Sequence, residues 1–209
     1  TEDFLACGLA IDKQIEELDT VCRFVQAKSR SKKRIKLSFD EWNVWYKART
    51  PADIRKPGWP ERPPLIEEVY NQEDALLVGG SLITLLNNAD RVKCACMAQL
   101  VNIIGPIMTE PGGPAWRQSI FHPFALTARH AKGRVLRSLA SGPVKTNRAG
   151  MEVPYLHAAV TEDDATGEVT VFALNRSTTT SMELDVAMRG FGKARKITTA
   201  LEVHHADMK

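Results

Sequence analysis

Two carboxylates, one amide and three large aromatic rings are concentrated in one short run, Asp40-Glu41-Trp42-Asn43-Val44-Trp45-Tyr46. The run follows residues 35–39, in which apolar and polar side chains alternate as they do in a half-buried β-strand. Aromatic rings can stack on the C–H faces of a sugar, and a carboxylate at the end of a strand can attack or stabilise an anomeric carbon. This mixture of residues predicts a carbohydrate site.

The composition of the whole chain argues against two other classes of binding protein. The 209 residues carry a formal net charge of +3, which is too small to indicate nucleic-acid or membrane binding. No apolar run approaches the roughly 18 residues that a membrane span needs. Residues 28–36 are basic and could bind DNA, but a solvated loop that connects a helix to a strand is the preferred interpretation.

The cysteines predict a protein of the cytoplasm with buried free thiols. None of them forms a C-x-x-C pair, and no histidine lies at metal-ligand spacing from them, so we expect no zinc, no other metal and no cofactor. Two of them lie two residues apart on a predicted strand and should share one face. The four cysteines are Cys7, Cys22, Cys94 and Cys96.

The first part of the chain alternates between helical and extended patterns, as in an α/β protein with parallel strands. Gly79-Gly80 should let the second predicted helix lie close against a sheet, and Pro123 should kink or interrupt the third. The predicted helices cover residues 12–27, 73–88 and 115–132, and the predicted strands cover residues 35–39 and 92–100.

Beyond Gly133 the period of the apolar residues changes from that of a helix to that of a strand. Short strands separated by turn residues predict an antiparallel β-sandwich. These strands cover residues 135–139, 155–160, 169–174, 182–188 and 197–203. No residue in this part of the chain indicates catalysis.

The run from Ser38 to Trp45 closely resembles the nucleophile motif of family 51 glycoside hydrolases, the α-L-arabinofuranosidases. The run from Ala98 to Asn102 is similar to the end of the eighth barrel strand in that family. The resemblance implies a (β/α)8 TIM barrel followed by a jelly-roll-like β-sandwich. Residues 1–132 then correspond to the last strand–helix units of the barrel and residues 133–209 to a partial sandwich. The absence of an initiating Met fits a chain that begins inside a longer protein.

The resemblance also implies roles for individual residues. Glu41 is the expected catalytic nucleophile, Gln99 is expected to hydrogen-bond sugar hydroxyls, and Trp45 is expected to wall the subsite. Asp40 cannot be the second catalytic carboxylate, because neighbours on a strand project to opposite sides. The acid/base Glu of the family stands in an Asn-Glu pair, which this sequence lacks, so we expect no acid/base in this chain. Trp59 could line the cleft or pin its own loop.

The expected function is therefore retaining hydrolysis that releases terminal non-reducing α-L-arabinofuranosyl residues from arabinan or arabinoxylan. The alternative is a non-catalytic fragment that lacks the acid/base and at most binds sugar. The expected partners are an arabinose-containing poly- or oligosaccharide, the missing N-terminal part of the barrel, and further copies of the same chain.

Overall fold

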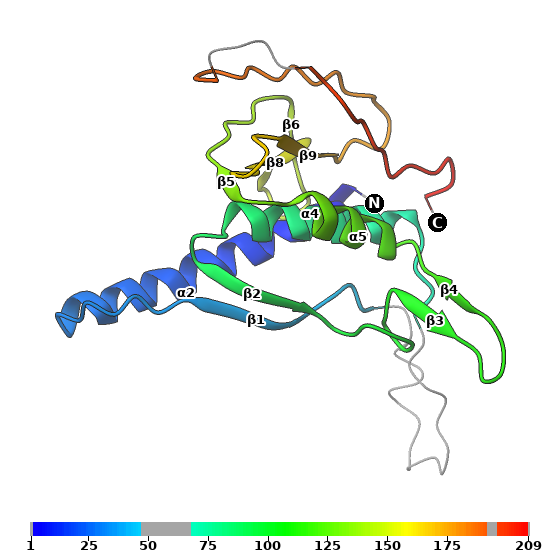
Figure 1. Ribbon diagram of the computed structural model, residues 1–209, viewed down its shortest axis with the longest axis horizontal. Helices are drawn as coiled ribbons and strands as arrows, with labels where there is room; N and C mark the ends of the chain where they lie inside the picture. Colours follow the sequence, from blue (N-terminus) through cyan, green and yellow to red (C-terminus); the bar gives the residue numbers. More distant parts are fainter. Residues whose placement is uncertain (1, 47–67, 192–195, 209) are drawn as a thin grey trace.

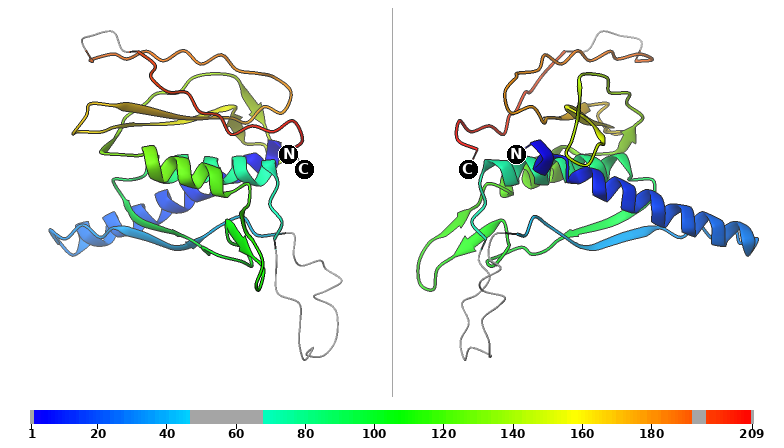
Figure 2. Two further views of the ribbon diagram at one scale, coloured as in Figure 1. Left: turned by 45° about the vertical axis from the view of Figure 1, so that its right-hand side comes forward. Right: turned by 180° about the vertical axis from the view of Figure 1, so that it is seen from behind.

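A computed structural model describes residues 2–46, 68–191 and 196–208 (Figure 1). The elements form three layers: a ribbon of two parallel strands, a layer of helices, and small antiparallel sheets on the far side of the helices (Figures 1 and 2). The C-terminal segment runs along the outside of the third layer. The residues of the predicted carbohydrate site lie in the first layer.

The helix layer is organised around α4 (Gln72–Asn87), beside which lie α1 (Glu2–Leu5), α2 (Gly8–Lys28) and α5 (Phe121–His130). The start of α4 is set by a capping box, in which the side chain of Asn71 accepts a hydrogen bond from the Asp74 amide and the Asp74 side chain accepts one from the Asn71 amide. The predictions of both α2 and α4 are confirmed. The C-terminal half of α2 extends beyond the rest of the molecule (Figure 1).

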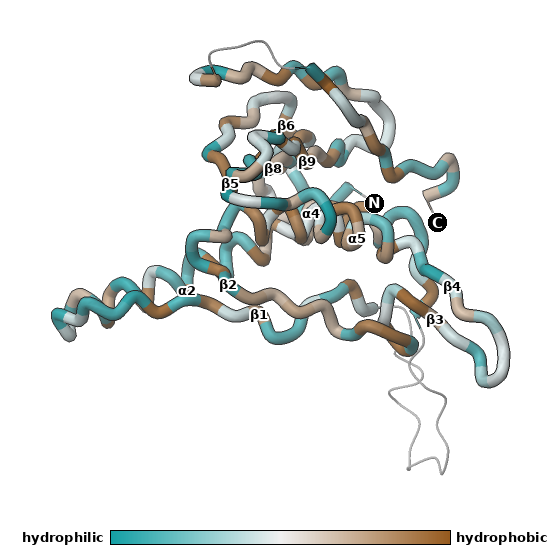
Figure 3. The backbone as a smooth tube through the Cα atoms, viewed as in Figure 1, coloured by the Kyte–Doolittle hydropathy of each residue, from teal (hydrophilic) through white to brown (hydrophobic). Residues whose placement is uncertain are grey.

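The ribbon consists of β1 (Leu37–Trp42) and β2 (Val92–Met97), which are parallel and are connected through α4. Phe39 and Ala95 are paired across the ribbon, and both pack against the core that α4 lines. Figure 3 shows apolar segments along α4, α5 and the ribbon strands. The opposite face of the ribbon is exposed in the described part of the chain; it carries Ser38, Asp40, Cys94 and Cys96.

The prediction that the cysteines are buried is wrong. Cys7, Cys94 and Cys96 are exposed, Cys22 is half-buried, and all four thiols are free. Cys94 and Cys96 share one face of β2, as predicted, and their sulfur atoms lie 3.5 Å apart. Cys94 and Cys96 are exposed because described residues cover only the other face of the ribbon.

The segment after β2 differs from its prediction at two places. The strand ends at Met97 and does not continue to Leu100. The predicted helix over residues 115–132 begins only at Phe121, because β4 (Ala115–Arg117) pairs with β3 (Ile107–Thr109) in a hairpin. Pro123 therefore lies in the first turn of α5, where its missing N–H has no helical partner to lose, and it does not kink the helix.

The third layer contains a three-stranded antiparallel sheet in the order β5-β8-β9 and a separate β6–β7 hairpin. The sheet packs on α4 at Gly80, where an added Cβ would lie only 3.0 Å from Leu174 Cδ2. The close approach predicted for Gly79-Gly80 is thus confirmed. The strands are β5 (Arg134–Leu136), β6 (Val144–Thr146), β7 (Glu152–Pro154), β8 (Leu156–Glu162) and β9 (Val169–Asn175).

The last two predicted strands, residues 182–188 and 197–203, do not form. Both segments show apolar alternation, but no neighbouring strand in the described structure pairs with either of them. Most of their large apolar side chains stay exposed, as in Ile197, which is 84% exposed. The chain then returns to the start of α4, where the Met208 carbonyl accepts a hydrogen bond from the Glu73 amide at 3.1 Å (Figure 2).

None of the helices that the structure describes is both long enough and apolar enough to cross a membrane.

Candidate functional site

Glu41 is the penultimate residue of β1, and its side chain is exposed. The register across the ribbon shifts at this point: Phe39 is opposite Ala95 and Trp42 is opposite Met97, so three steps along β1 match two along β2. A bulge of this kind re-aims side chains and is common beside active sites. Within the described residues the Glu41 carboxylate has no hydrogen-bond or ion-pair partner, whereas Asp40 accepts a hydrogen bond from Ser38 Oγ at 2.6 Å.

The aromatic residues after β1 divide between core and surface. Trp42 is buried in the core, and Trp45 is 53% exposed. Tyr46 is held beside it, because its amide donates to Glu68 Oε1 at 3.1 Å and its hydroxyl donates to Asp74 Oδ1 at 3.0 Å. Trp45 therefore presents an open indole face at the end of the strand. Trp59 lies outside the described residues.

Gln99 lies two residues beyond the end of β2, next to the end of β1. The strand ends are joined there by a hydrogen bond from the Ala98 amide to the Trp42 carbonyl at 3.0 Å. The Gln99 side-chain NH2 group donates to the Val101 carbonyl at 2.9 Å, which leaves its oxygen free to accept. The structure thus places Glu41 and Gln99 at the carboxyl ends of two adjacent parallel strands, and Trp45 three residues beyond the end of β1.

Three polar side chains support the backbone around these residues: Asn43, whose amide belongs to the run noted in the sequence, and Tyr70 and Gln118, which the sequence did not single out. Each of them hydrogen-bonds backbone groups near the end of β1 or in the loop that carries Gln99. Burial is the main cause of a raised pKa for Tyr70, and the carboxylates of Glu68 and Asp74 add to it. The Tyr70 hydroxyl therefore stays protonated and donates its hydrogen bond over the whole practical pH range.

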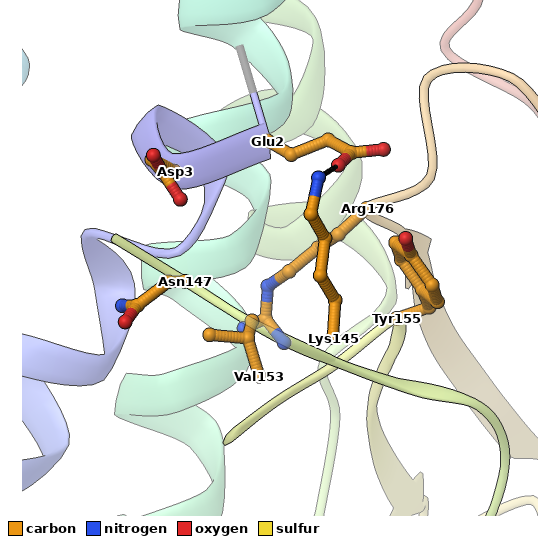
Figure 4. Close-up of a pocket in the computed structure, with 7 residues that line it drawn as sticks. All are labelled: Glu2, Asp3, Lys145, Asn147, Val153, Tyr155 and Arg176. Atoms are coloured by element: carbon orange, nitrogen blue, oxygen red, sulfur yellow. Dashed lines mark hydrogen bonds and ion pairs between the residues drawn. The ribbon is translucent and has the colours of Figure 1, made fainter. Parts of the chain in front are cut away.

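A second polar cluster lies on the other side of the helix layer and contains none of the predicted site residues. There Lys145 forms an ion pair with Glu2, and Arg176 and Tyr155 complete the lining of a shallow pocket (Figure 4). Glu2 also accepts a hydrogen bond from Thr178 Oγ1 at 3.2 Å. Arg176 instead donates hydrogen bonds to the carbonyls of Leu5 and Pro154, so this cluster joins the N-terminus to the third layer.

No group of three or more His, Cys, Asp or Glu side chains suited to holding a metal ion occurs in the described ranges.

An exposed carboxylate, an exposed indole and an exposed amide near the carboxyl edge of parallel strands are residue types that suit the binding of a sugar. Comparison with known proteins identifies the family. The model of the α-L-arabinofuranosidase C-terminal domain matches residues 40–209, and the chain belongs to that family.

Named relatives and a solved structure agree with this assignment. An intracellular exo-α-(1→5)-L-arabinofuranosidase of Halalkalibacterium halodurans is 45% identical over 99% of this chain and 41% of its own length. An exo-α-(1→6)-L-arabinofuranosidase of Bifidobacterium longum is 43% identical over 99% of this chain and 40% of its own. AbfB, a family 51 α-L-arabinofuranosidase of Bifidobacterium longum, superposes with a TM-score of 0.76 at 39% identity and covers 86% of this chain and 35% of its own. The chain therefore spans about two fifths of the length of the curated relatives that it matches.

Proposed function

We propose that this chain is the C-terminal part of a retaining exo-α-L-arabinofuranosidase in which Glu41 is the nucleophile. The observation that carries the proposal is the placement of Glu41: it is an exposed carboxylate at a bulge, at the carboxyl end of a parallel strand whose end is hydrogen-bonded to the segment that carries Gln99. The match to the family model begins at Asp40, so Glu41 lies within the matched region.

The proposed reaction proceeds by double displacement. Glu41 attacks the anomeric carbon of a terminal arabinofuranosyl unit, the bond to the leaving oxygen breaks, and a glycosyl ester forms on Glu41. Water then cleaves the ester and restores the original anomeric configuration. Gln99 Oε1 accepts a hydrogen bond from a sugar hydroxyl, and the Trp45 indole covers one face of the ring.

The acid/base that protonates the leaving oxygen is proposed to come from a part of the protein that precedes this chain. The exposed face of the ribbon supports this, because parallel strands are ordinarily covered on both faces. The apolar side chains on the extended half of α2 support it as well: Phe24 is 64% exposed and Val21 is 59% exposed. Both surfaces suit packing against further strand–helix units of a (β/α)8 barrel.

Residues 1–132 are accordingly proposed to be the last units of the barrel, and residues 133–209 a separate β-rich domain. The connection α4 between β1 and β2 has the strand–helix–strand order of a barrel unit. Gly133, at φ +70°, lies between α5 and β5 and fits the proposed boundary. A homo-oligomer and an intracellular location are proposed from the family alone.

The substrate is proposed to be an arabinose-containing poly- or oligosaccharide such as arabinan or arabinoxylan. The relatives do not select one linkage, because one is named for 1→5 bonds and another for 1→6 bonds.

The test is release of 4-nitrophenol from 4-nitrophenyl α-L-arabinofuranoside by the full-length protein that carries this sequence. Glu41→Ala should lower turnover by at least about 1,000-fold, as loss of a covalent nucleophile does. Azide should partly restore turnover of this variant and yield an arabinosyl azide of inverted configuration, because the anion attacks from the vacated side.

The matched control is Asp40→Ala, which removes the neighbouring carboxylate and should keep most of the activity. Unchanged turnover in Glu41→Ala would refute the nucleophile assignment. A correctly folded wild-type protein without turnover would favour the alternative, a non-catalytic member of the family that at most binds sugar.

A further inference from the structure

The loop that carries Gln99, residues 98–106, has an unusual backbone. Asn102 and Ile103 both have positive φ, at 59° and 56°. Positive φ is tolerated by Asn but is strained for a β-branched residue such as Ile, and such strain persists only where the surrounding structure enforces it. The loop is held in this backbone conformation by hydrogen bonds from side chains around it.

The side chain of Asn43 is fully committed to this loop and to its own strand end. Its NH2 group donates to the carbonyl of Ala98 and to the carbonyl of Ile104, each at 2.6 Å. Its oxygen accepts from the Val44 amide at 2.7 Å, which fixes the orientation of the amide. Asn43 therefore hydrogen-bonds the loop near both of its ends, and it lies two residues after Glu41 in the sequence.

Two buried side chains support the same loop from below. The Tyr70 hydroxyl lies 2.7 Å from the carbonyl of Val44 and 3.1 Å from that of Ile104, so it connects the segment after β1 to the same Ile104 carbonyl that Asn43 bonds. The Gln118 NH2 group donates to the carbonyl of Gly105 at 2.9 Å. Gly105 in turn lies so close to the backbone of Val101 that an added Cβ would be 2.8 Å from the Val101 nitrogen.

We propose that Asn43 is a positioning residue that holds the Gln99 loop in register with the end of β1, so that the Gln99 oxygen and the Glu41 carboxylate face the same sugar ring. Asn43 touches neither the sugar nor the reacting atoms; it acts through Gln99. The proposal rests on the proposed function of Glu41 and Gln99. It adds that the Asn43 amide, whose two N–H groups bridge the loop, keeps Gln99 in position relative to Glu41.

The first test is a double-mutant cycle in the full-length protein, with 4-nitrophenyl α-L-arabinofuranoside as substrate. Asn43→Ala and Gln99→Ala should each lower kcat/KM by about 100-fold, the loss typical of a misplaced positioning group. Because Asn43 acts through Gln99, the double variant should be no more than about threefold worse than Gln99→Ala alone. The two single variants should also divide their loss between kcat and KM in the same proportion.

The second test measures the loop without any substrate. In Asn43→Ala, the amides of Asn102 and Gly105, which donate to carbonyls within the loop region, should exchange with deuterium at least about tenfold faster. Amides of β8 and β9 should be unaffected. If Asn43→Ala does not fold, Asn43→Asp takes its place, since it keeps the size and the acceptor for the Val44 amide but removes both donors to the loop.

The matched control is Asn175→Ala, which removes another Asn side-chain donor to a carbonyl, that of Thr180 at 2.8 Å, at the end of β9. It should leave both kcat/KM and exchange in the loop unchanged. Multiplicative losses in the double variant, or unchanged exchange in the loop, would overturn the proposal. If the wild-type protein releases no 4-nitrophenol, the proposed function is refuted, whereas the exchange measurement still decides whether Asn43 holds the loop.

Discussion

Replacement of His157 should remove a loss of stability that the protein suffers at mildly acidic pH. His157 lies on β8 against α4, where its Nδ1 is buried and has no hydrogen-bond partner in the described structure. Burial, and secondarily the positive charge of Arg176, lowers the pKa of His157 from 6.5 to about 4. The imidazole is therefore neutral in the folded protein at pH values where it is protonated in the unfolded chain.

The sign and size of the effect follow from this difference. Above pH 6.5 both states are neutral at His157 and the residue adds no pH dependence. As the pH falls from 6.5 toward 4, the unfolded chain takes up a proton that the folded protein excludes, so the free energy of unfolding decreases. Each pKa unit corresponds to about 1.4 kcal/mol, so the loss is about 2 kcal/mol by pH 5 and about 3 kcal/mol when complete.

The assay compares the wild-type protein with His157→Asn by urea unfolding at pH 7.5 and pH 5. The wild-type protein should lose about 2 kcal/mol more stability than the variant between these two pH values. Asp12, whose pKa is raised mainly by burial, favours folding at low pH and so opposes His157. Asp12 is present in both proteins, so its contribution cancels in the comparison.

His204→Asn is the control, because His204 is exposed on the C-terminal segment. It should preserve the wild-type pH dependence. Equal losses of stability in the wild-type protein and in His157→Asn would refute the reasoning, since they would mean that the folded protein accepts the proton at His157 without cost.

Two further predictions concern α4. The Gly79→Ala variant should be more stable than the Gly80→Ala variant by about 1 kcal/mol. Both substitutions gain helix propensity. Only the Cβ at position 80 crowds a core side chain, because it would lie 3.0 Å from Leu174, whereas the Cβ at position 79 would lie 3.6 Å from Pro123. Thermal unfolding of the two variants measures the difference, and equal stabilities would contradict the packing of β9 on α4. Asn71→Ala should cost about 1 kcal/mol by removing the helix cap. Asn71→Asp retains a capping oxygen and should lose less; an equal loss in the two variants would exclude the cap as the cause.

The elements that the sequence predicts well are those whose signals are local. For α4, apolar periodicity places the helix to within one residue of its observed bounds, Gln72–Asn87. Residues 182–188 carry an equally clear strand alternation and yet form no strand. A strand also needs a partner edge, and no local pattern records whether one is available.

The difference between local signals and contacts that depend on the fold also applies to the proposed site. Glu41, Trp45 and Gln99, the proposed site residues, stand out because the runs that contain them resemble motifs of the family. The support of the Gln99 loop depends instead on the carbonyls of Ala98 and Ile104, and a carbonyl is present at every residue. Its donor, Asn43, lies 61 positions from Ile104 in the sequence. Only the parallel pairing of β1 with β2 brings this donor and its two acceptors together. The hydrogen bonds from Asn43 to the loop therefore depend on the fold and cannot be recognised in the sequence.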